Sequence, residues 1–405
     1  MSPLPASLPP SLLALANQIN TPALQNIPFT NDPDCIVRDC INQLSFKLLQ
    51  SPDDTSAVLS SMSLLLALGM LIATMDNNCD KERILCLPEG SLTKQLEEAI
   101  HQLLGQYNEE FSFDKHRIVS SVNFFVSGYY SQNPAFARIL SEHYHTEILH
   151  PSLTENAAEV ATEFVSRVTE GQITKLFNNP GLFKIAMGNV LLFQGAWTKA
   201  FNESNTVEFP FCCSNGRIIK NVKMMQSKEL LQFTNSGRFT AISKQLKHNG
   251  EKLNFIAIKP NAGTSINDFD SSHRDQMIQM LAEADHRKVN LMLPKIEIDT
   301  TIENLLDKIA EISGTDITID QLNRLGLVPG DALDVFQKIK ASINESGAKV
   351  AVTTIVKGET CGRPEKEIEF TFNSSGYIAF VDEGGRRLLE LMIKDGEFLV
   401  TDGLT

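Results

Sequence analysis

The chain carries, at residues 345–356, the stretch Glu345-Ser346-Gly347-Ala348-Lys349-Val350-Ala351-Val352-Thr353-Thr354-Ile355-Val356. Every second residue from Ala348 is small or β-branched, whereas the opposite face carries Lys349 and Lys357. This alternation with a period of two predicts a strand. The polar run 357–364 that follows contains glycine and proline and predicts an exposed loop. Taken alone, the segment is also compatible with an ordinary half-buried strand followed by a hairpin turn.

The composition is that of an acidic globular protein. Apolar residues make up 42% and charged residues 21% of the 405 residues, and the net charge is −13 with a pI near 5.2. This charge argues against nucleic acid, heparin-like polyanions and anionic membranes as main partners. No run reaches 18 apolar residues, so we expect no transmembrane helix.

The N-terminus and the cysteines indicate a reducing compartment. The first residues lack a basic start, and their longest apolar run, residues 12–16, is too short for the core of a secretory signal. The seven cysteines are odd in number and sparse, which is not typical of a disulfide framework. We therefore expect a cytoplasmic protein, or one exported without a recognisable signal peptide.

The order of the predicted elements indicates an α+β protein. Residues 1–30 are rich in Pro, Leu, Asn and Ser and are predicted to form a poorly ordered extension to a single domain at 31–405. Strands and helices are mixed without regular βαβ units. A strand is predicted at 118–126, and helices are predicted at 35–49, 64–75, 94–107, 134–144, 156–169 and 302–313.

Six further segments, in the same order along the chain, resemble the motifs of one family. Asn189-Val190-Leu191-Leu192-Phe193-Gln194-Gly195-Ala196-Trp197 is the sharpest match, to Asn-x-x-Tyr-Phe-x-Gly-x-Trp. The others are Leu59-Ser60-Ser61-Met62-Ser63 (Phe-Ser-Pro-x-Ser), Val122-Asn123-Phe124-Phe125 (Ala-Asn-x-Leu-Phe), 164–173 (Trp-Val-x-x-x-Thr-x-Gly-x-Ile), Val222-Lys223-Met224-Met225 (Val-Pro-Met-Met) and Leu293-Pro294-Lys295-Ile296 (Leu-Pro-Lys-Phe). With the stretch at 345–356, the chain from about residue 33 to its end resembles the serpins. Ser61 and Phe164 depart from the pattern, where proline and tryptophan are usual.

The resemblance implies a fold and a mechanism. The fold would be a single large domain with three β-sheets, about nine helices and an exposed reactive-centre loop at about 345–368. The protein would not be an enzyme but a suicide substrate: a protease attacks the loop, the hinge 345–356 inserts into the main sheet, and the acyl-enzyme is trapped. The alternative is a non-inhibitory serpin that acts as a binding or chaperone-like protein.

The hinge decides between these two functions. A strand that inserts must bury its inward face without charge or proline, and this hinge meets that condition. Its residues are Glu345, Gly347, Ala348, Val350, Val352 and Thr354. Val350 is bulkier than the alanine that is commonest there, so cleavage without trapping is a third possible outcome.

The family's spacing of sixteen residues from Glu345 identifies Cys361-Gly362 as the bond attacked. A small, mostly apolar cysteine suits elastase-like, chymotrypsin-like or subtilisin-like serine proteases, and a cysteine protease is a further candidate. Arg363 and Glu359 are rival positions. An exposed Cys361 could instead act as a redox switch.

Polar residues are expected where the main sheet must open, the region we call the shutter. The resemblance places Ser60, Ser63 and Asn189 there, together with Gln337 where the family often has a histidine. Such groups must be hydrogen-bonded when buried and can exchange partners as strands part. Ser60 and Ser63 could equally be caps of the helix that follows. Trp197, the only tryptophan, is expected in the core as a lid where the loop enters the sheet.

Other constellations predict no further chemistry. His143, His145 and His150 lack the carboxylate or cysteine that would complete a metal site, and no catalytic triad or phosphate-binding loop is present. We therefore expect no cofactor and no metal, and a protein that acts as a monomer.

Overall fold

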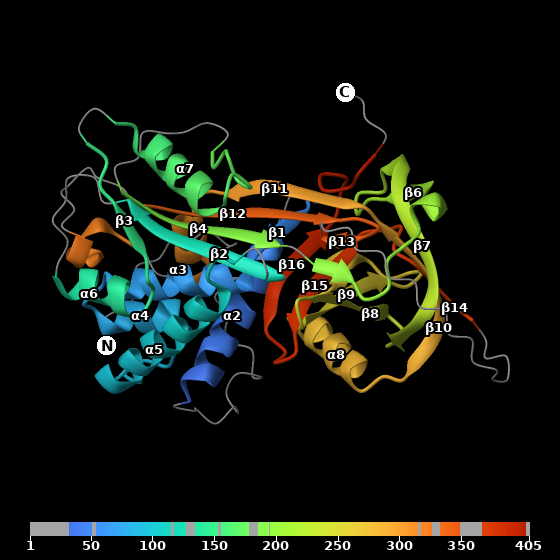
Figure 1. Ribbon diagram of the computed structural model, residues 1–405. Coiled ribbons are helices and arrows are strands. Elements are labelled where there is room, and N and C mark those ends of the chain that lie inside the picture. The colour runs from blue at the N-terminus through green and yellow to red at the C-terminus, as the bar shows by residue number, and fades with distance from the viewer. Residues whose placement is uncertain are drawn as a thin grey trace.

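The computed structural model describes residues 32–50, 54–114, 117–126, 134–152, 155–177, 185–193, 195–314, 317–325, 333–348 and 367–401. The predicted N-terminal extension lies outside them. The described part contains eight α-helices and two hydrogen-bonded sheets. All helices except α8 (Ser271–Ala282) lie around one sheet, and the other sheet lies with α8 at the opposite end (Figure 1). No helix of this part is long and apolar enough to span a bilayer.

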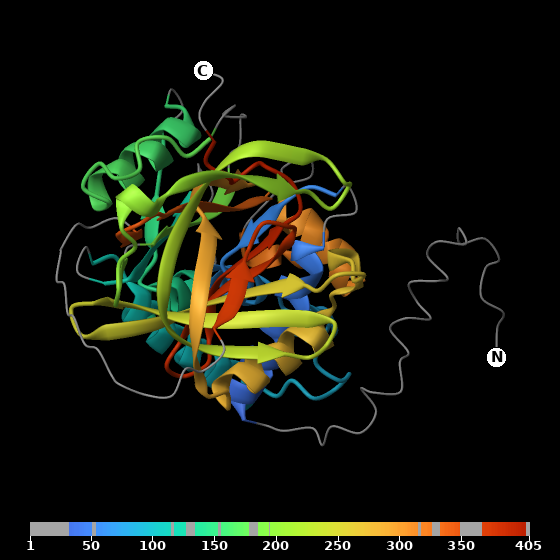
Figure 2. The same cartoon turned by 90° about the vertical axis from the view of Figure 1, so that its right-hand side faces the viewer.

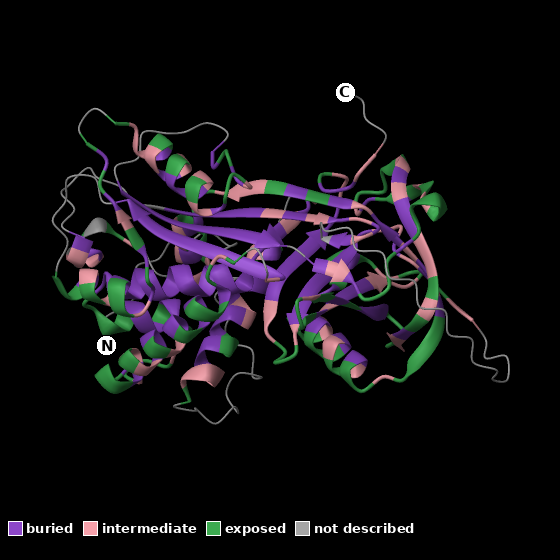
Figure 3. Ribbon diagram, viewed as in Figure 1, coloured by how far each residue is buried: buried purple, intermediate pink, exposed green. Residues whose placement is uncertain are grey.

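A five-stranded sheet forms the centre of the molecule. Its order is β11 (Ile296–Ile302), β12 (Leu333–Ile343), β4 (Ile185–Phe193), β2 (Val119–Val126) and β3 (Glu147–Leu149). Strands β12 and β4 are parallel neighbours, whereas β2 and β4 are antiparallel. Every residue of β2 and β4 is buried, because helices cover both faces of the sheet (Figure 3).

The two faces of this sheet are covered unequally. Helix α7 (Ala157–Val168) packs on one face through an aromatic cluster in which Phe124 contacts Phe164 and Phe336. On the other face lies α3 (Ser61–Ala73), whose residues are all buried, as expected of a helix that is apolar all round. Around it are α2 (Pro33–Leu49), α4 (Asn78–Ile84), α5 (Lys94–Phe111), α6 (Pro134–Glu142) and α9 (Leu305–Ser313) (Figure 1).

The second sheet has eleven strands and is strongly bent (Figure 2). The 18-residue strand β7 (Ile218–Asn235) pairs with β6 along its first part, with β10 along its middle and with β8 at its end. Two of the three expected sheets are thus joined through β7. The other strands are β1 (Ala57–Leu59), β5 (Gly195–Trp197), β6 (Val207–Cys212), β8 (Phe239–His248), β9 (Glu251–Pro260), β10 (His286–Pro294), β13 (Gly347–Ala348), β14 (Ile368–Thr371), β15 (Gly376–Asp382) and β16 (Arg387–Ile393); α8 (Ser271–Ala282) packs on β7 and β8.

The structure confirms the predicted helices but corrects two of their starts. Helix α3 begins at Ser61 rather than at residue 64, because Ser60 caps it. Helix α9 begins at Leu305 rather than at residue 302, because Ile302 still pairs with Gln337 as the last residue of β11. Helices α4 and α8 were not predicted from the sequence, although Asp270 offers a typical N-cap for α8.

Candidate functional site

The central sheet is closed between β12 and β4. The two strands pair in parallel from Leu333 opposite Ile185 to Lys340 opposite Leu192. A strand running antiparallel to both could be placed between them and would then pair on each of its edges. The β12–β4 boundary is therefore the line along which a segment that follows β12 could add to the sheet.

Three polar residues lie side by side across this boundary. Gln337 on β12 is in register with Asn189 on β4, which is in register with Asn123 on β2. All three side chains lie on the face of the sheet toward α3. On the same strands, the residues two positions away, such as Met187 and Ile339, belong to the hydrophobic core that includes this helix. The Asn189 Nδ2 donates to Asn123 Oδ1 at 2.5 Å, whereas Asn189 Oδ1 is buried without a partner among the described residues.

Ser60 connects this polar row to α3 and to the second sheet. Its backbone N–H donates to Gln337 Oε1 at 2.8 Å, and Gln337 Nε2 donates back to the Ser60 carbonyl at 3.1 Å. Its hydroxyl donates to the Leu388 carbonyl at 2.8 Å and accepts from the Ser63 N–H at 3.2 Å. Ser60 is thus both the helix cap and the partner of Gln337, so the two interpretations of this residue are compatible. The Ser63 hydroxyl, by contrast, is buried and makes no hydrogen bond within the described residues.

The polar row continues away from the sheet through Asn108, which no sequence motif singled out. Asn123 Nδ2 donates to Asn108 Oδ1, and Asn108 Nδ2 donates to the Tyr144 carbonyl. A lone asparagine in the apolar strand Val119–Val126 was the signal available for Asn123. Asn108 lies at the end of an amphipathic helix, and no local pattern distinguishes it from a surface residue.

The chain reverses its direction as soon as β12 ends. Asn344 and Gly347 form an antiparallel bridge, with N–H···O bonds of 3.0 and 3.1 Å in the two directions. Beyond this turn, β13 pairs antiparallel with β5, which follows β4 along the chain. The first residues of the predicted hinge therefore already lie between the ends of the two strands that would have to part.

Gly347 is required by this turn. Its φ is +120°, and a Cβ atom there would lie 2.2 Å from the Gly195 carbonyl oxygen and 2.7 Å from the Trp197 nitrogen. Only glycine combines that backbone conformation with so close an approach of a second backbone.

Glu345 anchors the same turn. Its carboxylate accepts a hydrogen bond from Thr206 Oγ1 at 2.6 Å and forms an ion pair with Lys295 Nζ at 2.9 Å. Burial alone would raise the pKa of Glu345, but the bonds from Thr206 and Lys295 outweigh it and hold the pKa below its usual value. Lys295 belongs to a segment that resembles the family pattern, yet its pairing with Glu345 is visible only in the structure.

Trp197 lies against the turn, in the core. Its indole Nε1 donates to the Asn344 carbonyl at 2.8 Å, and its backbone N–H donates to the Ser346 carbonyl at 3.0 Å. Its ring makes edge contacts with Phe201 and Phe255. The position agrees with a lid over the start of the hinge. The other predicted hinge residues, Val350, Val352 and Thr354, and the bond Cys361-Gly362 lie outside the described residues.

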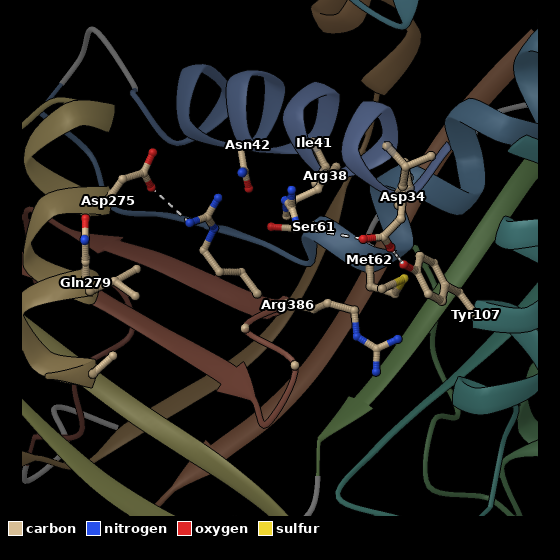
Figure 4. A pocket seen from close by; sticks show the side chains of 17 residues that line it. Asp34, Arg38, Ile41, Asn42, Ser61, Met62, Tyr107, Asp275, Gln279 and Arg386 are labelled. Atoms are coloured by element: carbon tan, nitrogen blue, oxygen red, sulfur yellow. Dashed lines mark hydrogen bonds and ion pairs between the residues drawn. The ribbon is translucent and has the colours of Figure 1, made fainter. Parts of the chain in front are cut away.

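A separate pocket of about 910 Å³ lies between α2, α8 and the β15–β16 hairpin (Figure 4). Apolar residues such as Met62 and Ile278 line it together with Arg38, Arg386 and Arg387. The Arg387 side chain is only 9% exposed; its Nη1 pairs with Asp275 at 3.0 Å, whereas its Nη2 has no hydrogen-bond partner among the described residues. The pocket thus combines an apolar wall with three arginines. No local pattern in the chain predicted this pocket.

Metal ligation is not indicated by the described residues, where no three His, Cys, Asp or Glu side chains converge. His143 lies 3.4 Å from Glu98, and His145 lies 3.1 Å from Glu109. Both histidines therefore have acidic partners on α5.

Comparisons with known proteins agree with this architecture. The chain is 27% identical over 251 residues to serine protease inhibitor 2 of Anopheles gambiae, a match that covers 58% of this chain and 60% of that protein. It is 24% identical over 337 residues to the corticosteroid-binding globulin of Homo sapiens, which covers 80% of each. Among solved structures, the thermophilic serpin tengpin in its native state superposes with a TM-score of 0.75 at 19% identity, covering 90% of this chain and 95% of that one.

These relatives thus include a serine protease inhibitor and a corticosteroid-binding globulin. A family model described as Serpin (serine protease inhibitor) matches residues 39–389, which is most of the chain. Together with the closed five-stranded sheet and the folded-back hinge, this match establishes that the chain belongs to the serpin family.

Proposed function

We propose that this serpin inhibits a protease as a suicide substrate. The protease attacks the Cys361-Gly362 bond, and the hinge then inserts between β12 and β4 before the acyl-enzyme is hydrolysed. The observation that carries the proposal is the start of the hinge, which already turns back at Asn344–Gly347 and pairs with β5. Inhibitors among the relatives, such as the mosquito protein, support it.

The driving force would come from strand addition. An inserted hinge replaces one parallel pairing by two antiparallel pairings and buries the valines of one face. Burial contributes roughly 1.5–3 kcal/mol per valine, and each new ladder hydrogen bond contributes about 1 kcal/mol net. About a dozen inserted residues would then supply on the order of 10 kcal/mol or more. That is comparable to the stability of a typical domain and sufficient to displace an attached protease.

The small side chain of Cys361 favours serine proteases with apolar pockets of the elastase, chymotrypsin or subtilisin type as targets. The test is incubation with elastase, chymotrypsin, subtilisin and trypsin, followed by denaturing gels and mass spectrometry. A complex that survives denaturation, with a released peptide beginning at Gly362, is the expected result. Cleavage without a complex and without a gain in thermal stability would contradict the proposal.

A charge on the inward face of the hinge should abolish trapping. Ala348→Arg would have to bury a guanidinium in the sheet, so the protein should be cleaved as an ordinary substrate while its native stability stays near that of the wild type. Ala351→Arg places the same charge on the opposite face and is the matched control, which should still form the complex. Unaffected trapping by the Ala348 variant would show that the hinge is assigned wrongly.

We propose, as a second candidate, that the pocket binds a small ligand with an apolar body and an acidic group. The three arginines that line the apolar pocket, Arg38, Arg386 and Arg387, favour it, since a guanidinium group can bind a carboxylate or sulfonate through charge-assisted hydrogen bonds. A relative that is named as a corticosteroid-binding globulin supports this second candidate.

The probe for this candidate is 1-anilinonaphthalene-8-sulfonate, which combines aromatic rings with a sulfonate. Saturable binding to the native protein that Arg387→Met removes is the expected result. Arg238→Met, on an exposed arginine paired with Asp268, is the control. Equal binding by the wild type and the Arg387 variant would exclude the pocket as the site.

A further inference from the structure

A buried ion pair contacts the residues that bind the hinge turn, Trp197 and Phe201. Lys244 on β8 and Glu229 on β7 have side chains that are 1% and 8% exposed. The ammonium group donates to both carboxylate oxygens, at 2.7 and 2.8 Å. Its third hydrogen bond goes to the carbonyl of Lys199, at 2.8 Å. The three donors of the ammonium are thus all used.

The same ammonium group contacts two aromatic rings. Lys244 Nζ lies 5.3 Å from the centre of the Trp197 ring and 4.9 Å from the centre of the Phe201 ring. Because the site is dry, these cation–π contacts are of the stronger, desolvated kind. Lys244 therefore contacts three residues of one short segment, 197–201, through one charged atom.

The same segment, 197–201, also forms hydrogen bonds to the hinge turn at residues 344–347. The N–H of Trp197 donates to the Ser346 carbonyl, and the N–H of Phe201 donates to the Glu345 carbonyl at 2.9 Å. The Trp197 indole adds its bond to Asn344. Segment 197–201 thus contacts both the ion pair and the turn at the start of the hinge.

A buried ion pair is a weak source of stability, because desolvation of both charges offsets their attraction. A leucine and a methionine would fill the same space without that cost. They would not, however, donate a hydrogen bond to the Lys199 carbonyl or make cation–π contacts with the two aromatic rings. The arrangement is therefore better explained by positioning than by net stabilisation.

We propose that Lys244, held by Glu229, is a positioning residue for the hinge: it fixes segment 197–201 and thereby keeps the turn 344–347 docked until a protease attacks. Its role in inhibition rests on the proposed function, whereas the docking of the turn does not. Loss of the pair should free the turn and let the native state convert without protease.

The test uses the full chain and compares three variants with the wild type. Lys244→Met leaves the Glu229 carboxylate buried and unpaired and is expected to destabilise the protein. The double variant Lys244→Met/Glu229→Met removes both charges, so that its global stability returns to near the wild-type value. Lys247→Met changes an exposed lysine on the same strand and is the charge-matched control.

Hydrogen–deuterium exchange and fluorescence of the sole tryptophan report on the turn itself. In the double variant, exchange at the amides of Trp197 and Phe201 should be about tenfold faster, as expected when local opening no longer has to break a desolvated cation–π contact. Quenching of Trp197 fluorescence by acrylamide should increase in parallel. The Lys247 variant should match the wild type in both.

The double variant decides the outcome. If its exchange and quenching equal those of the wild type, the pair is only structural and the proposal is wrong. If they change, the native double variant should also lose its capacity to trap chymotrypsin several-fold faster on warming. A wild type that traps no protease would refute the proposed function while leaving the exchange result intact.

Discussion

Single residues set how firmly the hinge is held in the native state. Glu345 contributes through Thr206 and Lys295, Gly347 through its lack of a side chain, and Trp197 through two hydrogen bonds to the turn. All three act on residues 344–347, so each can be weakened separately while the rest of the fold is kept.

The Glu345 contacts predict a dependence on pH. Because the folded-state pKa of Glu345 lies below its ordinary value of 4.5, its ionised form stabilises the native state above that pH. This contribution is lost as the pH falls through the folded pKa. The difference in unfolding free energy between the wild type and Glu345→Gln should therefore be constant from about pH 6 to 8 and shrink below about pH 4.5. Urea denaturation across this range measures it, with Glu208→Gln as the exposed control; a difference independent of pH would contradict the assigned pairing.

Gly347 should tolerate no side chain. The Cβ of alanine would approach the Gly195 carbonyl to 2.2 Å, so Gly347→Ala must displace one of the two backbones. Gly171→Ala is the control, because Gly171 also has a positive φ but no atom near its missing Cβ. We expect the unfolding free energy of the Gly347 variant to be lower than that of the control by about 1–3 kcal/mol. Equal values for the two variants would mean that the turn is not packed against β5.

Among the elements, the start of α3 contacts β12, one of the two strands that must separate when the sheet opens. Ser60 caps the helix, and the same residue exchanges two hydrogen bonds with Gln337 on β12. Movement of β12 away from β4 would therefore have to break, or to carry along, the two hydrogen bonds between Gln337 and Ser60. Histidine at position 337 would add a charge that titrates; glutamine holds the same place without one.

Removal of the Gln337 amide should destabilise the native state. Gln337→Leu leaves the buried N–H of Ser60 without an acceptor, which costs about 1–3 kcal/mol. Gln337→His, which keeps a donor and an acceptor, should recover part of the loss at neutral pH. The measurement is the midpoint of urea unfolding for the three proteins. A fully stable leucine variant would show that the pairing with Ser60 contributes nothing.

At the scale of the whole molecule, inhibition requires the closed sheet to part along β12 and β4. A disulfide between Lys340→Cys and Leu192→Cys, which are in register, joins the two strands at a spacing that a disulfide can bridge. We expect this variant to be cleaved without trapping until a reductant is added. Asp299→Cys with Lys340→Cys joins β11 to β12, which stay together, and should trap in both states. Trapping by the oxidised β12–β4 variant would show that the sheet does not open there.

Much of the fold could be predicted from local patterns. The helices predicted at 35–49 and 64–75 correspond to α2 and α3. The start of α9 was placed too early, because Ile302 fits the helix pattern but is held in β11 by its partner on β12. The joining of two sheets through β7 was also missed, since no local signal shows where a continuous strand changes partners.

Periodicity, turn residues and motifs are local properties of the chain, so they were sufficient to predict the family, the order of the elements and an uncharged inward face for the hinge. Which polar groups meet, by contrast, depends on the packing of segments that are far apart in the chain. Glu345 and Thr206, Lys244 and the Trp197 ring, and Gln337 and Ser60 come from distant segments. Their hydrogen bonds and charge contacts depend on strand register and helix packing. Those are fixed by burial of the whole core, and no single stretch of sequence encodes them.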